Sequence, residues 1–209
     1  MYNQSIIRKY ARMNNGAIIP RRWRNTAIFV DGTKNFINRT NPINYTRYKK
    51  RYCLSYMVGT CPDGMICIGH GPLAGSHVDH YLQNQSNLNL QLVNSQIGAQ
   101  RIFTAGTDKG FHLEQFVVPM HNNVFNTAAQ TNENAGFSKM RVTNEHDIGR
   151  VTNEWKYIDF SKLLPLGLKP LGKQYRVCII MTNLLTILDY NSTTLYYDCP
   201  PPTLAEYFV

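Results

Sequence analysis

Apolar residues come in short runs along this chain, and these runs predict strands. The run 26–31 is typical of a buried strand that ends in an aspartate, and 101–105 is another short apolar strand. Two further strands are expected at 53–59 and 65–69. Because the turn-forming residues 62–64 (Pro-Asp-Gly) separate these two strands, the pair is expected to form an antiparallel hairpin.

Helical patterns fill much of the remaining chain. A short basic helix is expected at 3–13, a helix begins near Ser76, a long helical segment covers 121–157, and a last helix covers 171–188. The segment 191–209 is expected to be an extended tail. This order of elements predicts an α/β domain in which helices flank a mixed sheet. No apolar run approaches the ~20 residues that a membrane span needs, so no membrane association is expected.

The charge of the chain is concentrated at one end. Of its 209 residues, 43% are hydrophobic and 17% are charged, which is an ordinary globular composition. The net charge is +9, and residues 1–51 contain twelve lysines and arginines but only one acid, Asp31. Such a basic surface favours binding to a polyanion such as DNA, because cations that contact phosphates release counterions. A solvated basic surface or a contact for an acidic partner remains the alternative.

Cysteine and histidine residues give little indication of metal chemistry. The five cysteines have no CxxC spacing and are odd in number, which favours reduced, mostly buried thiols in an intracellular protein. His77 and His80, with His70 nearby, allow a zinc site as a minor alternative. Their spacing matches no standard zinc finger, and a tetrahedral site needs a fourth ligand.

Acidic residues recur where predicted strands end. Asp31 closes the first strand and Asp108 follows the strand at 101–105. A buried acid is costly without a partner, and both a neighbouring arginine and a metal ion are open as that partner. Glu145 on the long helical segment is expected to lie across the same edge of the sheet. Three carboxylates so close repel one another unless divalent cations lie between them, and their hard oxygen ligands suit Mg²⁺. Two ions about 4 Å apart would support in-line displacement at a phosphate.

Several sequence blocks, in order along nearly the whole chain, resemble the endonuclease domain of DDE-superfamily transposases. The likeness is to the Harbinger type and to domesticated nucleases derived from it. The segment 29–33 (FVDGT) is similar to the first-aspartate block, 107–111 (TDKGF) to the second-aspartate block, and 141–150 (RVTNEHDIGR) to the helix with the third acid. Further similar blocks lie at 48–56, 62–66, 71–79, 170–177 and 200–207.

This resemblance implies an RNase H-like fold and Mg²⁺-dependent cleavage and transfer of DNA strands by a two-metal mechanism. It implies that Asp31, Asp108 and Glu145 are the catalytic residues and the metal ligands, with Mn²⁺ as a substitute ion. It also implies three regions: a basic lead-in at 1–25 as the remnant of an upstream helical region, the endonuclease domain at 26–190, and the tail. DNA is the expected partner, a separate DNA-binding protein and a homodimer are compatible with the family, and the expected location is the nucleus.

Some positions depart from the family pattern. Thr107 stands where the family usually has glycine, and Val78 stands where it has the histidine of a His-Asp pair. His146 occupies a position where tryptophan or arginine is common, and Ile148 a position where an aromatic residue is common. None of these changes removes a proposed ligand, but together they indicate a divergent gene. The alternative functions are therefore a domesticated or decayed relative that binds DNA or protein without cutting, and a structural protein with no role on DNA.

Two further acids have open roles. Asp79, near a predicted helix start, either complements the helix dipole or assists a metal site as an additional acid. Asp147 lies two residues beyond Glu145 and is expected to face solvent, although a shifted helix register would exchange the two roles.

Basic and aromatic residues near the blocks are candidates for DNA contact. The expected nucleic-acid contacts are Lys49, Lys50, Arg51, Lys109 and Arg141. The tyrosines interleaved with the first of these, at 45, 48 and 52, either stack on unpaired bases or pack into the core.

Overall fold

The computed structural model of the chain describes residues 21–23, 25–38, 41–95, 103–158 and 170–208. The basic helix predicted at 3–13 and most of the lead-in lie outside these residues, and so does the start of the strand predicted at 101–105.

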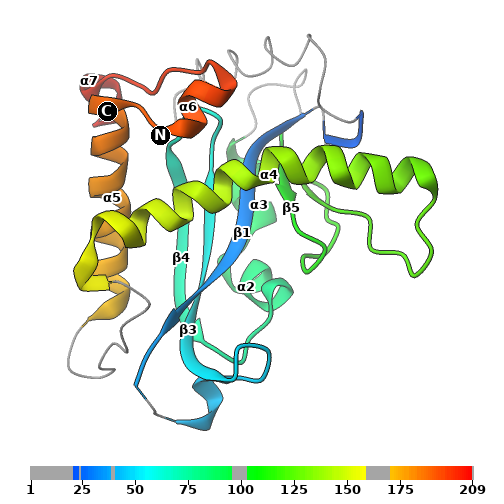
Figure 1. Cartoon of the computed structure of the whole chain (residues 1–209), viewed down its shortest axis with the longest axis horizontal. Coiled ribbons are helices and arrows are strands. Elements are labelled where there is room, and N and C mark those ends of the chain that lie inside the picture. Colours follow the sequence, from blue (N-terminus) through cyan, green and yellow to red (C-terminus); the bar gives the residue numbers. More distant parts are fainter. Residues whose placement is uncertain (1–20, 24, 39–40, 96–102, 159–169, 209) are drawn as a thin grey trace.

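A mixed sheet of parallel and antiparallel strands forms the centre of the fold (Figure 1). Its central strand β1 (Thr26–Phe36) pairs antiparallel with β3 (Arg51–Thr60) and parallel with β5 (Thr104–Thr107). On the outer sides, β4 (Ile66–Ala74) pairs with β3, and β6 (Val117–Pro119) pairs parallel with β5. This mixed topology with flanking helices is consistent with an RNase H-like fold, as the sequence predicts. A two-residue strand, β2 (Tyr45–Thr46), pairs with the start of β3.

Helices cover both faces of the sheet because alternate residues of β1 are apolar on both sides. Phe29 belongs to a buried cluster that includes Phe137 of α4 (Ala128–Glu154). Val30, the next residue, belongs to another cluster that includes Leu82 of α2 (Asp79–Ser86) and Leu88 of α3 (Leu88–Ser95). Successive side chains of a strand point to opposite faces, so β1 holds a helical layer on each side. The helix α5 (Leu171–Asp189) packs beside α4 against β3 and β4.

The predicted hairpin and the last long helix are confirmed, with longer boundaries than the sequence indicates. β3 and β4 form the antiparallel hairpin, and Gly64 in its turn has a positive φ of 73°. β4 continues past residue 69 through Pro72, which is compatible with a strand because β4 lies at the edge of the sheet. Some short elements are not predicted from the sequence, among them β6, α3 and the 3-10 helix Arg21–Trp23.

The prediction of an extended tail from residue 191 on was wrong. The segment contains two short helices, α6 (Ser192–Tyr197) and α7 (Leu204–Tyr207). α6 begins with a capping box in which the side chain of Asn191 accepts from the backbone N–H of Thr194, and the Thr194 hydroxyl caps the N–H of Asn191. Tyr197 packs into the cluster beside α4, which places α6 against that helix.

Asp147 is buried, so the expectation that it faces solvent was also wrong. Its carboxylate accepts hydrogen bonds from Asn191 Nδ2 at 3.0 Å and from Thr193 Oγ1 at 2.9 Å. Asn191 Nδ2 also donates to the carbonyl oxygen of Gly64 at 3.1 Å. Burial raises the pKa of Asp147 from 3.8 to about 7, although the Thr193 hydrogen bond acts in the opposite direction. This side chain therefore joins α4, the start of α6 and the hairpin turn.

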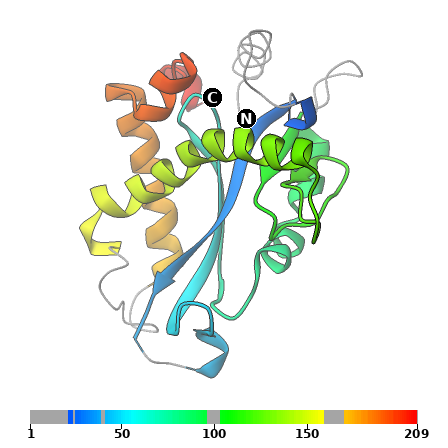
Figure 2. The ribbon, with the colours of Figure 1, turned by 45° about the vertical axis from the view of Figure 1, so that its right-hand side comes forward.

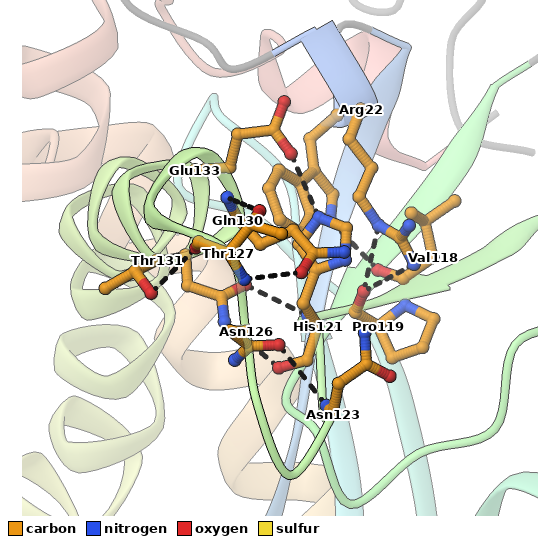
Figure 3. Close-up of polar contacts among 12 residues, drawn as sticks. Arg22, Val118, Pro119, His121, Asn123, Asn126, Thr127, Gln130, Thr131 and Glu133 are labelled. Carbon is orange, nitrogen blue, oxygen red and sulfur yellow. Dashed lines mark hydrogen bonds and ion pairs between the residues drawn. The ribbon is translucent and has the colours of Figure 1, made fainter.

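The N-terminal end of α4 is fixed beside the end of β6 (Figure 3). Thr127 and Gln130 form a capping box at its first turn. His121, just after β6, lies 2.9 Å from the Glu133 carboxylate, and Trp23 Nε1 donates to a backbone carbonyl of β6 at 3.0 Å. These contacts set the position from which α4 crosses the sheet.

None of the described helices combines the length and the apolar character that crossing a bilayer requires. All five cysteines are free thiols, four of them buried.

Replacing Asp147 by alanine is expected to lower the free energy of unfolding by about 1–3 kcal/mol, because Thr193 and Asn191 lose a buried acceptor. Urea unfolding of Asp147→Ala measures this loss. Asp189→Ala, which truncates an exposed aspartate at the end of α5, is the matched control and is expected to change stability by less than about 0.5 kcal/mol. An equal effect of both substitutions would contradict the role of the buried carboxylate.

The same residue predicts a pH dependence. The pKa of Asp147 in the folded chain, about 7, lies above its ordinary value of 3.8, so the folded state binds this proton more tightly than the unfolded state does. Its contribution to stability is therefore complete below about pH 4 and is lost as the pH rises to about 7. Asp147→Asn is expected to reduce this fall in unfolding free energy. An unchanged slope between pH 4 and 7 would rule out this titration.

Candidate functional site

Asp31 and Asp108 are brought together by the register of two parallel strands. The last paired residues of β1 and β5 are Val30 and Thr107, and the two aspartates follow them directly. Asp31 lies inside β1 rather than at its end, which corrects the sequence-based expectation. β1 continues beyond Asp31 because it still pairs with β3, whereas β5 stops at Thr107. Asp31 is therefore the first residue of β1 beyond its pairing with β5, at the position where Asp108 leaves the sheet.

A third carboxylate, that of Asp79 at the start of α2, lies between the two aspartate segments. A Cβ atom added to Gly32 or to Gly110 would come within 3.0 Å of an Asp79 carboxylate oxygen, closer than real Cβ atoms approach. Gly32, directly after Asp31, and Gly110, two residues after Asp108, thus leave space for Asp79. Burial raises the pKa of Asp79, and the nearby Asp108 raises it further. The sequence blocks contain Asp79, but they do not reveal that it lies between the other two segments.

Lys34 ties the segment before α2 to β1. Its Nζ donates to the Ser55 hydroxyl at 2.9 Å and to the carbonyl oxygens of Gly75 and His77 at 2.8 and 3.2 Å. The charge of Lys34 lowers the pKa of Asp79 against the larger effect of burial. Lys34 therefore both positions the start of α2 and partly compensates the acid there.

Glu145 reaches this site through an arginine. Arg141, one turn earlier on α4, donates from Nη1 to Asp31 at 2.6 Å and from Nη2 to Glu145 at 2.7 Å. Burial raises the pKa of Asp31 from 3.8 to about 6, and the Arg141 charge opposes this rise. Asp108 and Asp79 both raise it, which places their negative charges close to Asp31. The sequence allows either an arginine or a metal ion as the partner of Asp31. In the structure, Arg141 of α4, 110 positions further along the chain, pairs with it.

Asn144 fixes the orientation of α4 at this point. Its side-chain oxygen accepts from the Thr60 hydroxyl of β3 at 3.0 Å, and both residues are fully buried. Because Asn144 faces the sheet, the next residue, Glu145, lies on the exposed side of the helix, with 47% of its side chain accessible. Glu145 is thus half-exposed, whereas Asp147, which the sequence was expected to place towards solvent, is buried.

The donor set suits a hard divalent cation, but its present arrangement is neutralised by a guanidinium. Asp31, Asp79, Asp108 and Glu145 offer only carboxylate oxygens, which Mg²⁺ prefers. Among the described residues, no group of three or more His, Cys, Asp or Glu side chains is placed to hold a metal ion as the side chains stand. Arg141 lies between Asp31 and Glu145, so an ion shared by these two acids has to replace its charge.

The histidines near α2 do not form the zinc site that their spacing allows. His77 stacks on the ring of Tyr81 with centroids 3.9 Å apart, and His80 stacks on His112 at 4.6 Å. The zinc alternative therefore has no support in the part of the chain that the structure describes.

A comparison with protein-family models supports the sequence resemblance. Residues 30–183 match the model of a family described as DDE superfamily endonuclease. The matched segment runs from β1 into α5 and includes Asp31, Asp108 and Glu145. Comparisons with curated proteins and with solved structures found no match.

The close approach of Asp79 to the two glycines gives a test. In Gly32→Ala, the added methyl group is expected to push the Asp79 carboxylate towards solvent, because a side-chain end moves more easily than β1. The pKa of Asp79 should then fall towards its ordinary value, which carboxyl-carbon NMR titration measures, with a stability change of about 1 kcal/mol or less. An unchanged Asp79 titration would contradict this packing.

Gly149→Ala is the matched control for this substitution. No atom lies within 4 Å of a Cβ added at Gly149 in α4, so the alanine fits there without displacing a neighbour. It is expected to raise the free energy of unfolding by about 0.5–1 kcal/mol through helix propensity and to leave the Asp79 titration unchanged.

Proposed function

This chain belongs to the DDE superfamily endonuclease family, and we propose that it cleaves DNA phosphodiester bonds with divalent metal ions bound at the edge of the sheet. The observation that carries the proposal is the adjacency of Asp31 and Asp108 at the end of the β1–β5 pairing. Glu145 lies near them across a single guanidinium. All three acids fall within the family match.

Asp31 and Asp108 would hold the metal ions, and Glu145 would complete the coordination of the second ion. When bound, such ions stabilise the charge on the attacking and leaving oxygens of an in-line phosphoryl displacement. Mg²⁺ is the proposed ion, with Mn²⁺ as a substitute, because every available donor is a carboxylate oxygen. The finer resemblance to Harbinger-type nucleases leads us to propose a nuclear location.

The other residues of the site position these acids. Asp79 fills the space between Gly32 and Gly110, so it sets the separation of the two segments that carry Asp31 and Asp108. Arg141 neutralises Asp31 and Glu145 while no ion is bound. Once an ion replaces it, its guanidinium is free to bind a DNA phosphate in the same site, since arginine forms paired hydrogen bonds to phosphate oxygens.

A second function is favoured by the same guanidinium. An arginine that satisfies both Asp31 and Glu145 makes a metal ion unnecessary for neutralising them. The chain would then be a non-catalytic relative that binds DNA or a protein partner. The two functions differ in whether the carboxylates bind a metal ion and in whether DNA is cut.

Nicking of supercoiled plasmid DNA tests the catalytic proposal. The wild-type chain with Mg²⁺ or Mn²⁺ is expected to convert supercoiled plasmid to the open circular form, and EDTA should stop the conversion. Asp31→Asn and Asp108→Asn should each lower the rate at least about a hundredfold, because a catalytic metal ion contributes several kcal/mol to the transition state. Asp189→Asn, at an exposed aspartate of α5, should keep the wild-type rate. Equal nicking by all variants would reject the assignment of these residues.

Metal binding in the absence of DNA separates the two functions. Arg141→Gln is expected to bind Mn²⁺ about tenfold more tightly than the wild type in calorimetric titration, because no bound cation has to be displaced. Arg141→Lys keeps a charge without the paired geometry and should fall between the two. Asp31→Asn should lose the binding. If neither the wild type nor Arg141→Gln binds Mn²⁺, the non-catalytic function is favoured.

A further inference from the structure

The turn between β2 and β3 concentrates positive charge in a part of the sequence that has no acids. We call residues 47–51 the basic turn; its four cations are Arg47, Lys49, Lys50 and Arg51, and all of them are exposed. No acid occurs in the sequence between Asp31 and Asp63. In the described part of the chain, the side chains of Arg47, Lys49 and Lys50 have no hydrogen bond or ion pair. Like charges held together without a partner are unfavourable, so the turn is suited to an anionic ligand.

The backbone of the basic turn gives a second observation. Lys50 has a φ of 51°, in the left-handed region that glycine and asparagine adopt most easily. A lysine at this position is disfavoured locally, and residues in such conformations cluster at binding sites and other functional segments. The turn thus carries a cation where backbone geometry would favour a smaller residue.

Tyr48 stands apart from its two neighbouring tyrosines. The rings of Tyr45 and Tyr52 pack against each other with centroids 5.3 Å apart. Tyr48 is 83% exposed, and the described contact of its ring is with Lys49, whose Nζ lies 4.8 Å from the centroid. An exposed aromatic ring among cations is the combination that binds unpaired nucleic-acid bases, through stacking on the ring and phosphate contacts around it.

The basic turn is connected to the candidate active site through β3, which starts at the turn and pairs with β1. β3 pairs Val58 with Asp31, and Arg51 at the start of β3 is about 23 Å away at ~3.3 Å per residue. Figure 2 shows β1 and β3 running together past α2 towards this turn. The segment between β4 and α2 is attached to the chain just before β2, because the backbone N–H of Ser76 donates to the carbonyl oxygen of Ile43 at 3.2 Å. At ~3.4 Å per nucleotide along a duplex strand, the distance corresponds to about seven nucleotides.

We propose that the basic turn binds the DNA strand that flanks the cleavage site, with its cations on phosphates and Tyr48 stacked on an unpaired base. This inference rests on the proposed function in that it takes DNA as the ligand. The inference adds to the proposed function a second, non-catalytic DNA contact about seven nucleotides from the proposed metal-binding acids.

Binding of fluorescent oligonucleotides in EDTA tests the phosphate contacts. Lys49→Gln/Lys50→Gln is expected to weaken binding of a single-stranded oligonucleotide at least tenfold and to reduce the slope of log K against log salt by about 1.4, or about 0.7 for each phosphate contact. The control, Lys156→Gln/Lys173→Gln, removes the same charge from exposed lysines at the 3-10 helix Lys156–Ile158 and at α5. Equal loss in both double variants would overturn the proposal.

The stacking contact has its own pair of variants. Tyr48→Ala should weaken binding of single-stranded DNA about tenfold, whereas Tyr48→Phe, which keeps the ring, should bind like the wild type. Blunt duplex DNA should be affected much less by Tyr48→Ala. Equal effects of the two variants, or equal losses on duplex and single strands, would reject the stacked base. Competition by polyglutamate as strong as by DNA would identify the turn as a contact for an acidic protein and would overturn the DNA assignment.

These measurements are independent of cleavage. Because EDTA removes divalent ions, Asp108→Asn should bind the oligonucleotide at least as tightly as the wild type. If plasmid nicking fails while the turn variants lose DNA binding, the catalytic proposal is rejected and the interface stands. If nicking succeeds while the turn variants bind like their control, the interface is rejected and the catalytic proposal stands.

Discussion

The short parallel pairing of β1 with β5 is the constraint on which the site depends. Its register ends at Val30 and Thr107, so the two following aspartates leave the paired region side by side. The long pairing of β1 with β3 fixes Asp31 within the sheet, but only the pairing of β1 with β5 places Asp108 beside it. Burial raises the pKa values of Asp31 and Asp79, and cations compensate this: Arg141 of α4 for Asp31, and Lys34 of β1 for Asp79. The site therefore depends on compensating cations as well as on the register of the strands.

The choice of counter-ion links structure to the two candidate functions. A buried carboxylate without a partner is unstable, and the guanidinium of Arg141 satisfies Asp31 and Glu145 at hydrogen-bonding distance. In the folded chain this guanidinium therefore already compensates the Asp31 and Glu145 carboxylates. A metal ion that bound these acids would gain only the difference between its own binding free energy and that of the arginine. Arg141 thus stabilises the two carboxylates in the folded chain and would limit the affinity of the proposed site for a metal ion.

Local signals allow part of this structure to be predicted from the sequence. The apolar runs give β1 and the β3–β4 hairpin, and the family blocks indicate Asp31, Asp108 and Glu145. What the sequence does not reveal depends on contacts between distant segments. The bridge from Arg141 to Asp31 spans 110 positions, and the buried state of Asp147 results from a short helix 46 positions away. Helical spacing places Glu145 and Asp147 on different faces, but the contacts of α6 and Asn144 decide which face is buried.

The anchoring of α4 limits how the site can change. The helix is capped beside β6 at its start, joined to β3 through Asn144 next to Glu145, and held by the buried Asp147 two residues later. A shift of the whole helix would break all three attachments. Replacing Arg141 by a metal ion would therefore require rotation of the Arg141 and Glu145 side chains rather than a movement of the helix backbone. Because Glu145 is half-exposed and the backbone beneath it is fixed, the barrier to the proposed metal binding would lie in breaking two charged hydrogen bonds rather than in rearranging the fold.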